Sequence, residues 1–430
     1  MGIIQDWTEK LNRPETAEHL AMLYGGGEET VRRQRERYAA LIRRHAEVFP
    51  ENGPVFLFSA PGRTEIGGNH TDHNRGRVLA ASVSLDTLCA VSSRKDSLVH
   101  FYSEGYAPIT VDLSTTEPVP EEEGTTAALI RGVADGMKLA GYRIGGFDAV
   151  ATSQVASGSG LSSSAALEVM LTGVLDGLYN DFAMPFQERA QISRRAENLH
   201  FGKPSGLLDQ MASAAGGLVT VDFQDDRNPK VEALGYDFAR KGFALVVVGT
   251  GGSHANLTEH YAAIPREMKM TAACFGQETL RGITREDLLG RMGELRKSVS
   301  DRALLRAMHF VEEDARVPEQ VSALKEDRIE DFLRLINESG RSSCMYLQNI
   351  YATAEDESLC LALCVADALL KGKGAWRIHG GGFAGTTLNF VPFSVLEDFV
   401  RVMNGTFGEN ACHVLNIRPV GADRMAASDV

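Results

Sequence analysis

The sequence predicts a mixed α+β protein built from two halves that meet near residue 230. Short apolar runs bounded by glycine or proline alternate with stretches whose apolar residues recur at helical spacing. The 430 residues are enough for two or three domains. A charged segment at 225–229 ends in proline and is the strongest linker candidate near the middle. We therefore expect one domain at residues 1–230 and a second at 231–430.

Both kinds of element are expected in the first half. Residues 4–50 are rich in Glu and Arg with scattered apolar positions, which is typical of surface helices. From Ser162 onward, apolar residues follow the spacing of a buried helical stripe. The predicted strands are 55–58, 147–151 and 218–223, with one or two more within 78–91, and the predicted helices are 125–139, 162–178 and 187–199.

The second half begins with a fully apolar strand at 243–248. Helical segments fill most of 255–370, and a strand at 388–391 follows a glycine run. No internal repeat or low-complexity tract is present in the sequence.

Charge and hydropathy exclude several classes of protein. Lys and Arg number 44 against 57 Asp and Glu, and the net charge of −13 is the wrong sign for a non-specific nucleic-acid binder. No window approaches the about 18 consecutive apolar residues that a spanning helix needs, and the first residues lack the pattern of a signal peptide. Six scattered cysteines without a CxxC pair indicate free, mostly buried thiols. We expect a cytoplasmic protein that binds neither nucleic acid nor membrane.

A glycine- and serine-rich loop opens directly onto the helical stripe. The start of a helix leaves backbone N–H groups unpaired at the positive end of its dipole, which suits phosphate. Glycines allow close approach of the backbone, and serine hydroxyls can cap the helix or bind a phosphate-bound metal. A serine-capped helix after a flexible loop would explain the same pattern. The residues assigned to nucleotide binding are Ser157, Gly158, Ser159, Gly160, Leu161, Ser162, Ser163, Ser164 and Ala165.

A second loop, residues 61–74, follows the first predicted strand and contains Arg, Asn, His, Asp and several glycines. Sugar hydroxyls each need a hydrogen-bond donor or acceptor, and polar groups at the end of a strand can supply them. A plain polar turn is the alternative. His70 and His73 match no standard metal-ligand spacing.

A third loop, residues 379–387, carries a run of glycines before the last predicted strand. Such a run indicates positive φ angles or a close approach of the backbone to a ligand. A tight connection between strands would also explain it.

Taken in order, the three loops resemble the three motifs of the GHMP small-molecule kinases, and within that superfamily the galactokinase family. Residues 61–74 are similar to the family signature PGRxNxxGEHTDYN, the serine loop matches GLSSSA, and the third loop resembles GGGFGG. The resemblance spans about residues 55–390. It implies two α+β domains, with a left-handed βαβ unit in the first, a ferredoxin-like second domain and the active site in the cleft between them.

The resemblance also implies roles for individual residues. Asp209, in the segment Gly206-Leu-Leu-Asp-Gln, matches the catalytic aspartate, and Arg63 the catalytic arginine. Ser164 and Glu197 match the two ligands of Mg²⁺. The residues that align with sugar contacts are Asn69, His70, Asp72, Gly206 and Tyr261.

Three departures bear on the sugar. Asn69 stands where the family carries a glutamate, His73 replaces the usual tyrosine, and Ile264-Pro265 interrupts the stretch after Tyr261. An amide can bind a hydroxyl but carries no charge.

The resemblance implies transfer of the γ-phosphoryl group of ATP to the anomeric hydroxyl of galactose, with Asp209 as a base or as an orienting group. A kinase for another hexose, a hexose derivative or a pentose is the alternative enzyme. A sensor that binds sugar and ATP without turnover is the alternative of another class. Nothing in the sequence points to a partner protein, and a monomer is expected.

Overall fold

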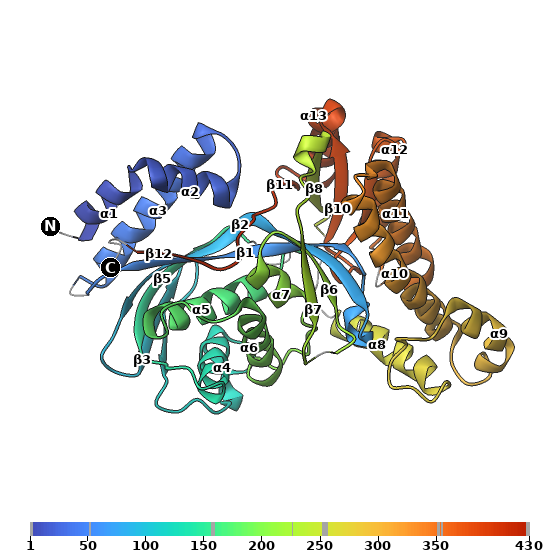
Figure 1. Ribbon diagram of the computed structural model, residues 1–430, viewed down its shortest axis with the longest axis horizontal. Helices are drawn as coiled ribbons and strands as arrows, with labels where there is room; N and C mark the ends of the chain where they lie inside the picture. The colour runs from blue at the N-terminus through green and yellow to red at the C-terminus, as the bar shows by residue number, and fades with distance from the viewer. Residues whose placement is uncertain are drawn as a thin grey trace.

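The structure is a computed structural model that describes residues 3–50, 53–155, 160–225, 227–251, 257–350, 353 and 356–426. Within these residues the chain forms an eight-stranded and a four-stranded β-sheet, with helices packed against both (Figure 1). This architecture confirms the predicted mixed α+β class.

The larger sheet has the strand order β12-β1-β2-β5-β3-β4, and β6 and β7 extend it from β2. β3 and β5 run parallel, with a helix between them in the chain, whereas β1 and β2 form a long antiparallel pair. The strands are β1 (Phe56–Gly67), β2 (Arg77–Ser93), β3 (Leu98–Ser103), β4 (Ile109–Asp112), β5 (Phe147–Ser153), β6 (Leu218–Asp222), β7 (Lys230–Leu234) and β12 (Asp423–Ala426).

Helices cover both faces of the larger sheet (Figure 1). The helices α1, α2 and α3 pack on one face, against apolar residues of β1, β2 and β5. The helices α4 to α7 pack on the other face. The bounds are α1 (Ile3–Leu11), α2 (Pro14–Tyr24), α3 (Glu28–Val48), α4 (Thr126–Leu139), α5 (Ser163–Tyr179), α6 (Phe186–Leu199) and α7 (Leu208–Ala215).

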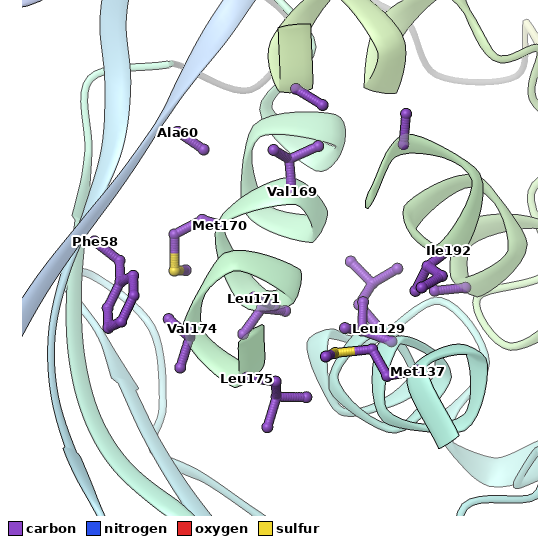
Figure 2. Close-up of a cluster of buried hydrophobic side chains, with 14 of the residues drawn as sticks. Phe58, Ala60, Leu129, Met137, Val169, Met170, Leu171, Val174, Leu175 and Ile192 are labelled. Carbon is purple, nitrogen blue, oxygen red and sulfur yellow. The ribbon is translucent and has the colours of Figure 1, made fainter. Parts of the chain in front are cut away.

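The central helix of this second face is α5, and its apolar stripe is buried as the sequence predicts. Figure 2 shows Met170 and Val174 on the side of α5 that faces Phe58 of β1, while Leu129 of α4 and Ile192 of α6 lie on the opposite side. A helix surrounded by a sheet and other helices is apolar on most of its circumference. This packing fixes the direction of α5 and therefore the place of its N-terminus.

The smaller sheet has the order β11-β8-β10-β9, all antiparallel. Helices lie on both of its faces, and α8 and α9 extend beyond it (Figure 1). The bounds are β8 (Phe243–Gly249), β9 (Ala375–His379), β10 (Thr386–Pro392), β11 (Cys412–Leu415), α8 (Thr258–Ala273), α9 (Arg285–Leu295), α10 (Asp301–Lys325), α11 (Ile329–Ser342), α12 (Ser358–Leu370) and α13 (Leu396–Phe407).

The strand β8 is apolar throughout because helices cover both faces of the smaller sheet. Leu245 and Val247 pack against α10 and α11, and Val246 and Val248 pack against α12 and α13. A strand buried on both faces has no polar side chain to alternate with its apolar ones.

The structure corrects two sequence predictions. The strand expected to end before Pro61 continues to Gly67, so Arg63 and Glu65 lie on β1 and not in a loop. Its register on β2 shifts between Pro61 and Arg63. Such an irregularity lets a strand accept a proline, which has no N–H to donate. The linker candidate at 225–229 lies in the connection of an antiparallel hairpin, since β6 pairs with β7 from Leu218 to Asp222.

The division at residue 230 stays a prediction. Both β7 and the last described strand, β12, belong to the larger sheet, and one apolar core joins Leu79 and Leu161 to Val247 and Leu388 of the smaller sheet.

All six cysteines are free, as predicted, but only Cys89 is buried and Cys364 is exposed. Within the described residues, no helix has the length and apolar character needed to cross a bilayer.

Candidate active site

Arg63 and Asp209 form an ion pair between β1 and the first turn of α7. Arg63 Nε donates to Asp209 Oδ1 at 2.6 Å, and Nη2 donates to Oδ2 at 2.7 Å. Bidentate pairing of this kind fixes both position and orientation. Burial acts to raise the pKa of Asp209, but the Arg63 guanidinium outweighs burial and holds that pKa below its ordinary value. Asp209 is therefore a carboxylate at neutral pH.

The segment that leads into α5 is bound to the same pair. Ser162 Oγ donates to Asp209 Oδ2 at 2.7 Å, and Ser162 itself has a left-handed backbone with φ of 59°. Its hydroxyl therefore serves Asp209 and does not cap the helix. Arg63 Nη1 donates to the carbonyl of Gly160, and the Arg63 N–H donates to the carbonyl of Leu161 at 3.0 Å.

The remaining residues of the predicted nucleotide loop divide into two groups. Ser163, Ser164 and Ala165 form the first turn of α5, so their backbone N–H groups lie at the positive end of the helix dipole. Ser157, Gly158 and Ser159 lie outside the described residues.

Ser164 and Glu197, the predicted metal ligands, are in contact. Ser164 Oγ donates to Glu197 Oε1 at 3.0 Å, and the carboxylate of Glu197 is buried on α6. Mg²⁺ prefers such oxygen donors and binds through one or two protein groups together with phosphates and water. Within the described residues, no group of three or more His, Cys, Asp or Glu side chains forms a metal cage. The donor set therefore fits a nucleotide-bound Mg²⁺.

Two further residues bind Glu197 and were missed from sequence. Lys203 Nζ contacts Glu197 Oε1 at 2.7 Å, and Gln210 Nε2 donates to Glu197 Oε2 at 2.8 Å. Gln210 directly follows Asp209, and its amide also reaches the buried Glu168 at 3.0 Å. The segment around Lys203 matches no motif, so no local signal could have identified it.

Asp72 and Gly206 lie against each other. A Cβ on Gly206 would overlap Asp72 Oδ2, which explains the need for glycine at this position. A cavity of about 560 Å³ opens beside the two residues, with His73, Arg194 and Lys269 in its lining. This volume is in the range of small-molecule pockets, which is about 300–1,000 Å³.

Asn69 is fully buried, and its amide is surrounded by protein partners. The Nδ2 group donates to Glu65 Oε1 at 2.9 Å and to the carbonyl of Gly380 at 2.8 Å. The Oδ1 atom accepts from Ser343 Oγ at 3.2 Å and from Asn349 Nδ2 at 3.0 Å. The donor and acceptor groups of the Asn69 amide are thus all bonded to other protein groups.

His70 and Tyr261 both contact the glycine run of the third loop. His70 Nε2 donates to the carbonyl of Gly381, and Tyr261 Oη donates to the carbonyl of Gly382, each at 3.0 Å. Burial, together with His73, lowers the pKa of His70 to about 4, so the ring is neutral. Burial raises the pKa of Tyr261 to about 12. Three of the predicted sugar-side residues, Asn69, His70 and Tyr261, therefore form one wall with the third loop.

Glu65 and Arg377 connect β1 to β9 behind this wall. Arg377 is fully buried, and its Nη2 lies 2.5 Å from Glu65 Oε1, the oxygen that also accepts from Asn69. Sequence reasoning missed this pair because the two residues are far apart in the chain.

A two-sheet α+β fold with an Arg–Asp pair at the head of a serine-led helix defines a small-molecule kinase of the GHMP superfamily. Residues 128–217 match the family model described as the N-terminal domain of GHMP kinases. Residues 43–93 match the model described as the galactokinase galactose-binding signature. A galactokinase from Streptomyces coelicolor is 31% identical over 376 residues, which cover 86% of this chain and 95% of the relative. The chain belongs to the galactokinase family.

Other relatives agree with this assignment. A galactokinase from Enterococcus faecalis is 27% identical over 394 residues, covering 89% of this chain and 97% of the relative. The crystal structure of Lactococcus lactis galactokinase complexed with galactose superposes with a TM-score of 0.78 at 25% identity, covering 90% of this chain and all of that one. A mevalonate kinase with a TM-score of 0.58 at 15% identity shares the fold. The chain is therefore a sugar kinase, with ATP as one substrate.

Proposed function

We propose that this enzyme transfers the γ-phosphoryl group of ATP to the anomeric hydroxyl of galactose, giving galactose 1-phosphate and ADP. The observation that carries the proposal is the bidentate Arg63–Asp209 pair bound to Ser162 at the head of α5. The carboxylate can bind the acceptor hydroxyl, and the guanidinium can bind the phosphoryl group. Both lie at the start of a helix, which favours phosphate binding. Relatives that are named galactokinases support galactose as the acceptor.

Asp209 is suited to orienting the acceptor hydroxyl. Both of its oxygens accept from Arg63, and Ser162 adds a third donor. A carboxylate with a lowered pKa is a weak base near neutral pH, so little driving force for proton removal comes from it. In a loose transition state, the position and charge of such groups supply most of the catalysis.

Arg63 is the cation nearest to this carboxylate, and its Nη1 also holds the exit of the phosphate loop. It lies in position to stabilise charge on the oxygens of the transferred group. Ser164 and Glu197 would hold Mg²⁺, which supplies neutralisation of the phosphate charge when it is bound. Lys203 Nζ lies 2.7 Å from Glu197 Oε1 and supplies positive charge beside these two residues.

The first prediction concerns Asp209→Asn. The amide keeps the shape but loses the charge that pairs with Arg63 and orients the acceptor hydroxyl, so we expect kcat to fall by about 10²–10³-fold while the protein stays folded. Release of ADP with Mg²⁺-ATP and galactose measures the effect, and circular dichroism checks the fold. Near-normal turnover by this variant would reject the role of Asp209.

A kinase for another hexose, a hexose derivative or a pentose is the second candidate, and one observation favours it. The amide of Asn69 is occupied by four protein contacts, whereas the family carries a glutamate at this position. A panel of sugars, assayed by ADP release beside Asp209→Ala as a blank, separates the candidates. Turnover of galactose far below that of another sugar would assign the enzyme to that sugar.

A cytoplasmic location and a monomeric state are also part of the proposal. Size-exclusion chromatography with light scattering tests the monomer.

A further inference from the structure

His379 is a buried histidine that connects the two sheets beside the candidate site. It is the last residue of β9 and is 2% exposed. Its Nε2 lies 3.0 Å from Thr64 Oγ1, and its Nδ1 lies 3.0 Å from Thr386 Oγ1. Thr64 directly follows Arg63 on β1, and Thr386 begins β10. The imidazole therefore spans from the strand that carries Arg63 to the smaller sheet.

The same pair supports the exit of the phosphate loop. A Cβ at Gly160 would overlap Thr386 Oγ1 and lie 2.8 Å from His379 Nδ1, so the backbone of Gly160 rests directly on these side chains. The carbonyls of Gly160 and Leu161 in turn accept from Arg63. Arg63, the loop exit and the His379–Thr386 pair thus contact one another.

The ring of His379 carries no charge in this connection. Burial, followed by the nearby Arg63 and Arg377, lowers the pKa of His379 well below its ordinary value, so the ring is neutral. A neutral imidazole donates from one nitrogen and accepts at the other, and a threonine hydroxyl can satisfy either. Both ring nitrogens are therefore paired without a charge beside Arg63.

We propose that His379 is a positioning residue for phosphoryl transfer. Through Thr64 and Thr386 it sets the position of Gly160 and Leu161 relative to Arg63. The inference rests on the proposed function, since it assumes that Arg63 and this loop act on ATP. We therefore expect His379 to affect kcat and KM for ATP, and not KM for the sugar.

Thr386→Val and Thr387→Val provide a matched test. Both threonines are buried on β10, and successive residues of a strand point to opposite faces. Thr387 Oγ1 accepts from Asn389 Nδ2 at 3.0 Å, away from His379. Each variant loses one buried hydrogen bond at similar volume, so we expect similar decreases in Tm. Only Thr386→Val should lower kcat, by about 10-fold, and raise KM for ATP, with KM for the sugar unchanged.

His379 itself gives the second measurement. We expect His379→Ala to lower kcat by more than Thr386→Val does, and His379→Gln to recover part of the loss, because an amide also donates and accepts. Equal kcat values for Thr386→Val and Thr387→Val, or no recovery with glutamine, would reduce His379 to a structural residue and overturn the inference.

Failure of the proposed function is distinguishable from failure of this inference. If the wild-type enzyme turns over no sugar, calorimetric titration with a non-hydrolysable ATP analogue and Mg²⁺ replaces the assay. Weaker binding in Thr386→Val than in Thr387→Val supports the positioning role, and equal binding overturns it.

Discussion

Asn69 and Glu65 form a buried contact between two positions at which this chain departs from the family signature. The family signature has asparagine at the position of Glu65 and glutamate at the position of Asn69, so amide and carboxylate have changed places in this chain. The structure puts the two side chains in contact, with Asn69 Nδ2 2.9 Å from Glu65 Oε1. The pair in this chain therefore consists of one amide donor and one carboxylate acceptor.

This contact gives the second prediction. Asn69→Asp replaces a buried donor by a carboxylate that faces Glu65 and the carbonyl of Gly380, so we expect the free energy of unfolding to fall by about 2–5 kcal/mol. In a Glu65→Gln background the loss should be smaller, because the glutamine amide can donate to the new carboxylate. Urea unfolding of the four proteins measures the coupling, which we expect at about 1–3 kcal/mol. Additive effects of the two substitutions would contradict it.

At the scale of single residues, the sequence predicts side chains that lie in a motif and misses those brought in by the fold. Arg63, Ser162 and Asp209 are in recognisable segments, and the structure joins all three. Arg377 lies outside every motif, and His379 opens the third loop but carried no predicted role, since only the pairing of β9 with β10 and the packing of β9 beside β1 show what these two side chains contact.

At the scale of elements, Asp86 holds the N-terminal helices to the larger sheet. Its fully buried carboxylate accepts from Tyr24 of α2 and Arg37 of α3, each at 2.6 Å. Arg418, from the segment before β12, reaches the same carboxylate at 3.2 Å. Burial acts to raise the pKa of Asp86, but the two arginines outweigh burial and keep that pKa below its ordinary value. Asp86 is therefore a carboxylate whose negative charge is compensated by Arg37 and Arg418.

The third prediction follows from this compensation. Asp86→Asn leaves the buried guanidinium of Arg418 and the partly exposed guanidinium of Arg37 without their counter-charge, so we expect the free energy of unfolding to fall by about 3–5 kcal/mol. Since Asp86 lies outside the candidate site, KM values measured below the transition temperature should stay unchanged. Glu47→Ala is the control, because its pair with Arg44 is largely exposed and should contribute less than about 0.5 kcal/mol. Equal losses in the two variants would show that the Asp86 network does not stabilise the fold.

Element boundaries are predicted well where one periodicity dominates. The helix expected at 125–139 begins at Thr126 in the structure, because the Thr125 hydroxyl accepts from the N–H of Ala128. The extension of β1 through Pro61 could not be predicted, because it depends on the long partner strand β2. The sequence predicts a linker where β6 and β7 form a hairpin, since charged turn residues look alike in both settings.

At the scale of the whole molecule, one contact between the two halves is made by a buried histidine. His309 of α10 is fully buried, and its Nε2 donates to the carbonyl of Asn69 at 2.9 Å while Nδ1 accepts from Ser342 at 2.9 Å. Burial lowers the pKa of His309, and Arg316 and Arg377 act in the same direction against Glu313. The ring is therefore neutral near pH 7, and its acceptor contact with Ser342 requires this neutral form.

A dependence of stability on pH follows from this requirement. The unfolded chain binds a proton at a histidine near its ordinary pKa of about 6.5, whereas the folded chain does not. Acidification below that value therefore stabilises the unfolded state, and each buried neutral histidine costs the folded state about 1.4 kcal/mol per pH unit until its own lowered pKa is reached. Stability conferred by His309 is thus present above about pH 6.5 and lost as the pH falls.

His309→Gln isolates this contribution, because the comparison with wild type cancels every other titrating group. The variant should be less stable at pH 7.5, since glutamine replaces a well-placed ring, but it should lose less stability on going to pH 5.5. Urea unfolding at the two pH values measures the difference, which we expect at about 1 kcal/mol. His413→Gln, on the edge strand β11, keeps the number of histidines equal and should behave as wild type. Parallel losses in wild type and His309→Gln would mean that folding does not lower the pKa of His309, and the assignment of its Nδ1 as an acceptor from Ser342 would then fail.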